Sequence, residues 1–139
     1  MADYFSSDFK LGILGGGQLG KMMLYDTRKL DIQTYVLDPS ADAPCRMSCN
    51  HFEKGALTDF DTVYEFGKKV DLLTFEIETI NVDALEKLEA EGTKVYPSPK
   101  TLRVIQDKGR QKKFYKDQGI PTAPFEHYKN VETLRNAIA

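Results

Sequence analysis

The sequence has little cysteine, no long apolar run and no excess of one charge sign, and each shortage excludes a class of protein. Its two cysteines, Cys45 and Cys49, are too few for a disulfide framework, so we expect a reducing, cytoplasmic setting. No run of about 18 apolar residues is present, which argues against a membrane partner. The 19 Lys and Arg residues nearly balance 21 Asp and Glu residues, giving a net charge of -2, and this balance argues against a nucleic-acid partner.

The length and composition are those of one globular domain. A chain of 139 residues with 41% hydrophobic residues can bury a core without disulfides or a structural metal. Residues 1–9 are polar and acidic and lack the apolar segment of a secretory signal. We therefore expect these nine residues to form an N-terminal extension.

Apolar, β-branched runs alternate with segments of helical periodicity along most of the chain. This pattern predicts an α/β fold with an open, mostly parallel sheet and helices on both faces. Strands are expected at residues 9–14, 34–37, 51–54, 72–77 and 94–96. Helices are expected at residues 18–30, 58–69, 82–91, from 99, 107–118 and from 131. In the first helix, the spacing predicts that Leu19, Met22, Met23 and Leu30 lie on one apolar face.

The pattern changes after residue 118. Gly119 ends a predicted helix, and Pro121 and Pro124 mark an extended segment before one more helix. We interpret residues 10–119 as one domain and residues 120–139 as the truncated start of a second domain.

A glycine-rich segment, GGGQLG at residues 15–20, follows the first strand and opens the first helix. Glycines allow a tight turn and close approach of a ligand, and the N–H groups at a helix start favour a phosphate. The segment therefore predicts a phosphate or nucleotide near residues 17–20, with a purely structural tight turn as the alternative. A dinucleotide site is a further alternative, in which Asp38 at the end of the second strand would bind ribose hydroxyls.

Two carboxylates lie at the end of the apolar strand predicted at residues 72–77. Glu76 is within the strand, and Glu78 follows it directly. Residues two apart in extended chain face the same side, and ligands of open α/β sheets bind at the carboxyl ends of the strands. If this strand neighbours the first, both acids lie beside the glycine loop. A loop that binds phosphate, next to carboxylates that bind hydroxyl or amine groups, is suited to a sugar phosphate or a ribonucleotide.

Five segments in this order resemble one known family. They are GGGQLGK at residues 15–21, Asp38-Pro39, TFEIE at 74–78, YPSP at 96–99 with Asp107-Lys108, and GIPTAP at 119–124. Together they are similar to the 5-(carboxyamino)imidazole ribonucleotide synthetases, the ATPase subunits of phosphoribosylaminoimidazole carboxylase in the ATP-grasp superfamily. The similarity extends from Lys10 over nearly the whole chain. Members of the family often have Asn directly after the second acid, where this chain has Thr79. The related glycinamide ribonucleotide transformylases usually have Glu at the position of Gln18.

The resemblance implies a Rossmann-like pre-ATP-grasp domain from a ligase of purine biosynthesis. Such a ligase joins bicarbonate to the amine of 5-aminoimidazole ribonucleotide with ATP and magnesium, through carboxyphosphate, and is commonly a homodimer. By resemblance, Gly17, Gln18 and Leu19 hold the substrate phosphate through backbone N–H groups and the Gln18 side chain. Glu76, and less clearly Glu78, contacts the rest of the substrate.

The resemblance also implies what this chain lacks. Lys108 stands where the family has a basic residue, often Arg, that contacts ATP phosphates. Most of the ATP site and the magnesium ligands would lie beyond Ala139, so the fragment alone is expected to be inactive and to bind no cofactor firmly.

Two other functions remain open from the residues. An NAD-binding domain of an oxidoreductase would explain the glycine loop and Asp38, but it gives Glu76 and Glu78 no role. A non-catalytic ribonucleotide-binding module would keep the fold without the chemistry. A metal site at Cys45, Cys49 and His51 is disfavoured, because the three residues lack a C-x-x-C pair and a fourth ligand.

Overall fold

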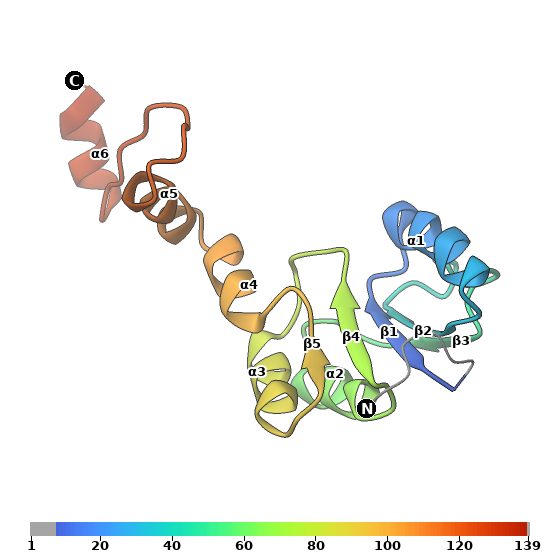
Figure 1. Cartoon of the computed structure of the whole chain (residues 1–139). Helices are drawn as coiled ribbons and strands as arrows, with labels where there is room; N and C mark the ends of the chain where they lie inside the picture. Colours follow the sequence, from blue (N-terminus) through green and yellow to red (C-terminus); the bar gives the residue numbers. More distant parts are fainter. Residues whose placement is uncertain (1–7, 139) are drawn as a thin grey trace. The chain divides into compact units, whose positions relative to one another are not determined.

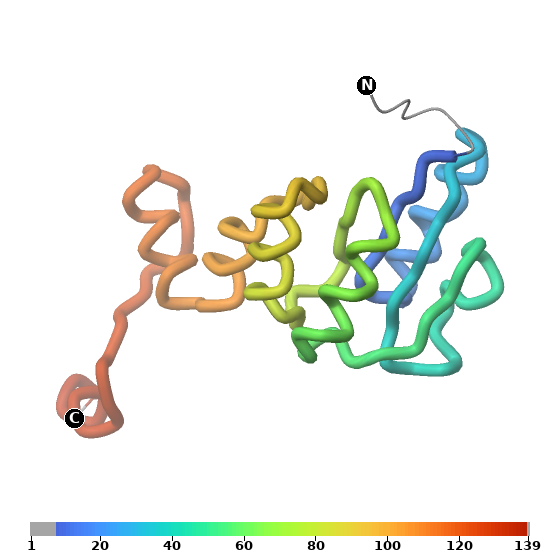
Figure 2. Tube along the Cα trace, turned by 90° about the horizontal axis from the view of Figure 1, so that it is seen from below, coloured from blue at the N-terminus to red at the C-terminus, as the bar shows by residue number. Residues whose placement is uncertain are grey.

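The computed structural model describes residues 8–138, in which one parallel sheet organises the first hundred residues (Figure 1). Its strands are β1 (Lys10–Leu14), β2 (Gln33–Asp38), β3 (His51–Lys54), β4 (Leu72–Phe75) and β5 (Lys94–Val95). They lie in the order β3-β2-β1-β4-β5, and every neighbouring pair is parallel. Figure 2 shows β1 and β2 running side by side. The predicted α/β fold with a parallel sheet is therefore confirmed, and the strand order is that of a doubly wound Rossmann-like sheet.

Helices cover both faces of this sheet, because neighbouring residues of a strand point to opposite sides. On one face, Ile13 of β1 and Val36 of β2 pack with Leu24 of α1 (Gln18–Lys29). On the other face, Leu14 and Leu37 belong to the larger core. That core includes residues of α2 (Phe60–Gly67) and α3 (Val82–Ala90), which Figure 1 shows on the side opposite α1.

Of the four residues predicted to form the apolar face of α1, Met23 packs against the core, whereas Leu19, Met22 and Leu30 are exposed, so most of that predicted face is wrong. The buried residues of α1 are Gly20, Leu24 and Thr27, whereas Leu19 is 62% exposed. The residues that share the buried face are spaced by four and three positions, so the helix turns the Leu24 side to the sheet. Gly20 allows this close approach, because a Cβ there would lie 3.0 Å from the Cys45 Sγ.

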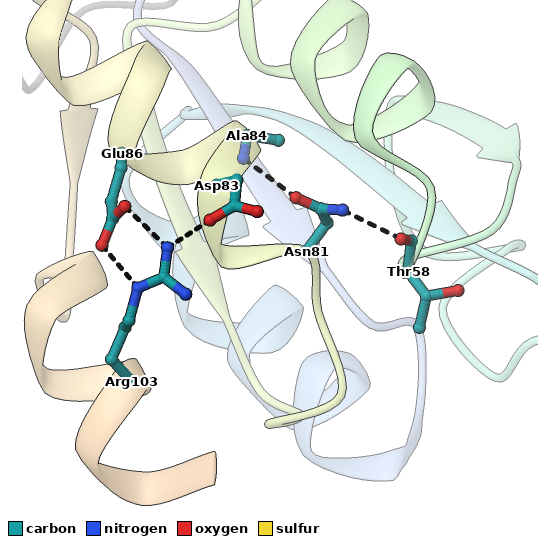
Figure 3. Close-up of polar contacts among 6 residues, drawn as sticks. All are labelled: Thr58, Asn81, Asp83, Ala84, Glu86 and Arg103. Carbon is teal, nitrogen blue, oxygen red and sulfur yellow. Dashed lines mark hydrogen bonds and ion pairs between the residues drawn. The ribbon is translucent and has the colours of Figure 1, made fainter. Parts of the chain in front are cut away.

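The start of α3 is fixed by Asn81 (Figure 3). Its Oδ1 accepts the Ala84 N–H at 3.0 Å, so Asn81 is the N-cap of this helix. Its Nδ2 donates to the Thr58 carbonyl at 3.1 Å, which ties the helix start to the segment before α2. On the same helix, Glu86 accepts two hydrogen bonds of 2.8 Å from Arg103 of α4 (Pro99–Gln106), and this contact lowers the pKa of the Glu86 carboxyl.

Substitution of Asn81 separates its two contacts. We expect Asn81→Ala to lower the free energy of unfolding by about 1 kcal/mol, the usual cost of losing an N-cap. Asn81→Ser keeps a hydroxyl acceptor for Ala84 and loses only the bond to Thr58, so its loss should be smaller. Urea unfolding followed by circular dichroism measures both, and equal losses would show that the cap contributes nothing.

The chain divides into two compact units, the first ending at Arg103 and the second beginning at Val104. The second unit contains α5 (Lys108–Asp117) and α6 (Val131–Ile138), neither of which has a buried residue. The predicted domain boundary after residue 119 stays a prediction. Residues 1–7 of the predicted N-terminal extension, and Ala139 at the end of the predicted second domain, lie outside the described residues. Across residues 8–138, helices are too short or too polar to span a bilayer.

Candidate functional site: the glycine loop at the carboxyl edge of the sheet

The glycine loop follows β1 and lies between the carboxyl ends of β2 and β4, the two strands that neighbour β1. Leu14, the last residue of β1, pairs with Leu37 of β2 and with Phe75 of β4. The chain leaves β1 through residues 15–17 and enters α1 at Gln18. The segments that follow β2 and β4 therefore flank the loop on both sides, where ligands of open α/β sheets bind.

Three successive N–H groups of the loop each have a partner from these flanking strands or segments. The Gly15 N–H donates to the Leu37 carbonyl at 2.9 Å. The Gly16 N–H donates to Oδ2 of Asp38 at 2.7 Å, and the Gly17 N–H donates to Oε1 of Glu76 at 2.9 Å. Two carboxylates therefore hold the loop, one from each side.

The loop conformation depends on glycine. Gly15 has φ of +99°, which is unfavourable for any residue with a Cβ. A Cβ at Gly15 would also lie 2.9 Å from the Glu76 carboxylate. Gly17 also has no room for a side chain, because a Cβ there would lie 2.8 Å from Glu76 Oε1. The loop and Glu76 thus fit together only because these side chains are absent.

Glu76 and Glu78 do not share an extended strand, and this part of the sequence prediction is wrong. β4 ends at Phe75, although the Glu76 N–H still donates to the Leu14 carbonyl at 3.1 Å. The chain bends at Glu76, which is half-buried, whereas Glu78 is exposed and its carbonyl accepts the Ile80 N–H at 2.9 Å. The bend aims the Glu76 carboxylate at the glycine loop, so the alternation of a strand no longer relates the two acids.

Gln18 and Leu19 occupy the exposed first turn of α1. Gly17 is the N-cap and has no side chain with which to accept a first-turn N–H. Gly17 therefore offers no capping side chain to the first-turn N–H groups of α1, while the Glu76 carboxylate accepts the N–H of Gly17 itself. This geometry suits an anion, and the roles predicted for Gly17, Gln18 and Leu19 stay predictions.

Cys45 is a contact of the loop that the sequence did not indicate. Its N–H donates to the Gly16 carbonyl at 3.0 Å, and its thiol donates to the Gly17 carbonyl at 3.6 Å. The side chain is fully buried. Burial, with Cys49, Glu76 and Asp38 nearby, raises the pKa of the Cys45 thiol to about 11. Residues 40–49 contain no periodic pattern, so only the folded structure brings this thiol to the loop.

Alkylation should therefore distinguish the two thiols. With a pKa near 11, about a thousandth of Cys45 is thiolate at pH 8, and the thiolate is the reactive form. We expect iodoacetamide to modify the partly exposed Cys49 first and to modify Cys45 only above pH 10 or after unfolding, as read by peptide mass spectrometry. Because the folded pKa exceeds the usual value of 9.0, Cys45 also favours the folded state below pH 9, and this contribution is lost between pH 9 and 11. Equal modification of the two thiols at pH 8 would contradict this prediction.

Lys108 belongs to the second compact unit, whereas the glycine loop belongs to the first. Lys108 is the first residue of α5, is exposed, and donates from Nζ to Oε1 of Gln111 at 3.4 Å. Asp107 caps the helix by accepting the Arg110 N–H at 3.0 Å. Among residues 8–138, His, Cys, Asp and Glu side chains nowhere form a group of three that could hold a metal ion.

Comparison with known proteins identifies the family to which the chain is similar. Residues 9–106 match the model of the ribonucleotide synthetase preATP-grasp domain. A chloroplastic phosphoribosylaminoimidazole carboxylase from Vigna aconitifolia is 41% identical over 115 residues, which are 83% of this chain and 21% of that protein. N5-carboxyaminoimidazole ribonucleotide synthetase from Thermotoga maritima has a TM-score of 0.84 at 37% identity, over 94% of this chain and 36% of that one.

A third relative was solved with ligands. The structure of N5-carboxyaminoimidazole synthase from Aspergillus clavatus in complex with ADP and 5-aminoimidazole ribonucleotide has a TM-score of 0.76 at 35% identity. It covers 85% of this chain and 31% of that one. The chain thus spans between 21% and 36% of the length of these three relatives. The match of the family model over residues 9–106 shows that the chain belongs to the ribonucleotide synthetase preATP-grasp domain family.

Proposed function

We propose that this chain is the ribonucleotide-binding N-terminal part of an ATP-dependent ligase that carboxylates 5-aminoimidazole ribonucleotide with bicarbonate in purine biosynthesis. The observation that carries the proposal is the bond between Oε1 of Glu76 and the Gly17 N–H. It places a carboxylate that can accept ribose hydroxyls beside a helix start whose first-turn N–H groups favour a phosphate. The Aspergillus clavatus relative, which binds 5-aminoimidazole ribonucleotide, supports the choice of ligand.

The substrate phosphate would bind at the first turn of α1. Because the Gly17 N–H donates to Glu76, the N–H groups offered to the phosphate are those of Gln18, Leu19 and Gly20, with the Gln18 side chain as a further donor. Gly17 contributes by lacking a side chain, which lets the phosphate approach the backbone closely.

Glu76 would orient the ribose. Its Oε1 is fixed by the loop, so Oε2 can accept hydrogen bonds from ribose hydroxyls without further rotation of the side chain. Glu78, exposed two residues further on, is the second candidate for a contact with the substrate.

The remaining chemistry would need parts of a ligase other than this loop. ATP and magnesium supply the activation of bicarbonate in such an enzyme, and Lys108 is the residue of this chain proposed to contact ATP phosphates. Residues 8–138 present no cluster of carboxylates for magnesium, so we derive no step through the metal. We expect the chain alone to bind the ribonucleotide but not to turn over, and we propose the homodimer of this family for the complete ligase.

The test is a titration of the chain with 5-aminoimidazole ribonucleotide, followed by isothermal calorimetry and by the N–H signals of residues 16–20. We expect saturable binding, weaker binding of ribose 5-phosphate, and no saturable response to NAD. NAD binding without ribonucleotide binding would favour the oxidoreductase domain and overturn the proposal. Binding of ribonucleotide by a protein that never gains ligase activity when joined to an ATP-grasp domain would favour the non-catalytic module.

A further inference from the structure

The carboxylate of Asp38 connects three parts of the chain at the edge of the sheet. Asp38 is the last residue of β2. Its Oδ2 accepts the Gly16 N–H and its Oδ1 accepts the Ser40 N–H, each at 2.7 Å. The strand end, the glycine loop and the segment that follows β2 therefore meet at one side chain.

The segment after β2 returns to the same glycine. The Cys45 N–H donates to the Gly16 carbonyl at 3.0 Å, so both backbone groups of Gly16 are held by residues 38–45. The fit is tight, because a Cβ at Gly16 would lie 3.0 Å from the Ala43 Cβ and 3.1 Å from the Asp38 Cβ.

Two acceptors are needed at position 38. Each carboxylate oxygen receives one backbone N–H, and an ionised carboxylate can accept at both oxygens. Asparagine has nearly the same shape but only one acceptor oxygen, and its NH2 group would face the other N–H. The structure therefore requires a carboxylate here for reasons that do not involve a ligand.

We infer that Asp38 is a positioning residue for phosphate binding, which acts by fixing the Gly16 peptide and thereby the direction of the first-turn N–H groups of α1. We assign it to the loop and not to the ribose, because both of its oxygens already accept backbone N–H groups. This inference rests on the proposed function, since it assumes that the first turn of α1 receives the substrate phosphate.

The test compares two ligands that share only the phosphate. For Asp38→Asn we expect the affinities for 5-aminoimidazole ribonucleotide and for inorganic phosphate to fall by the same factor, about three- to tenfold, the equivalent of one hydrogen bond. Asp42→Asn is the matched control, because Asp42 lies in the same segment with a 97% exposed side chain, and it should bind both ligands as the unmodified chain does. Chemical-shift titrations measure both affinities, and the Gly16 N–H signal should shift in Asp38→Asn alone.

A second variant leaves Asp38 in place. Gly16→Ala adds a Cβ against Asp38 and Ala43 at a backbone conformation open to alanine, so it should push the loop away and reduce both affinities together. A loss confined to the ribonucleotide in Asp38→Asn would show direct ribose contact and overturn the inference, as would unchanged binding of both ligands. If the unmodified chain binds phosphate but not the ribonucleotide, the proposed function fails, and the phosphate titrations alone decide the role of Asp38. If it binds neither ligand, both proposals fail.

Discussion

Gly17→Val is expected to reduce the affinity for 5-aminoimidazole ribonucleotide at least about tenfold, or 1.4 kcal/mol, while the chain stays folded. Gly17 has φ of -72° and ψ of -164°, which valine adopts without strain. The new Cβ would lie 2.8 Å from Glu76 Oε1, so the Glu76 carboxylate must leave the Gly17 N–H. The valine methyl groups would also occupy space in front of the first turn of α1.

Calorimetric titration of Gly17→Ala and Gly17→Val measures this effect as a graded series. Alanine displaces only the carboxylate, so its loss should be the smaller of the two. Unfolding curves from circular dichroism serve as the control for the fold. Full affinity in the folded Gly17→Val protein would show that the phosphate does not approach the α1 start, and the proposed site would be wrong.

Phe66→Ala is expected to give the largest loss of stability, about 3–5 kcal/mol. Phe66 is 1% exposed and belongs to the larger core between the sheet and the helices α2 and α3. A Cβ on Gly12 would lie 3.3 Å from Phe66 Cε1, so the ring packs on the backbone of β1. β1 is hydrogen-bonded to strands on both sides and cannot collapse into the cavity that alanine leaves.

Urea unfolding measures this loss. Domains of this size are stable by about 5–15 kcal/mol, so the variant should unfold at a much lower urea concentration or be partly unfolded without urea. Tyr25→Ala on α1 is the control, because Tyr25 is 58% exposed and its loss should stay within about 0.5 kcal/mol. A loss at Phe66 no larger than that at Tyr25 would contradict the packing described for α2.

The order and type of the helices and strands could be predicted from the sequence because they depend on neighbouring residues. Apolar β-branched runs and caps such as Asn81 act within one or two turns of the chain. The predicted strands at β1 to β5 differ from the structure by only one or two residues at their ends. The glycine loop was found for the same reason, since its motif is local.

Contacts of the site that join distant residues were not predictable in the same way. The strand that the pattern extended to Ile77 ends at Phe75, because the chain bends where Glu76 meets the glycine loop. The apolar stripe of α1 suggested that Leu19 and Met22 are buried, whereas both are exposed, since burial of Gly20 depends on Cys45, which lies 25 positions further along the chain.

The sequence by itself therefore determined that this protein has a parallel α/β sheet, a glycine loop at a helix start and two acids, Glu76 and Glu78, near the end of a later strand. Only the tertiary structure decided that Asp38 and Glu76 hold successive N–H groups of that loop, and that Cys45 lies beneath it. The physical reason is the distance along the chain over which each kind of interaction acts. Propensity, capping and periodicity act over a few residues, whereas the geometry of the site depends on strand pairing that brings together residues 22 and 59 positions apart.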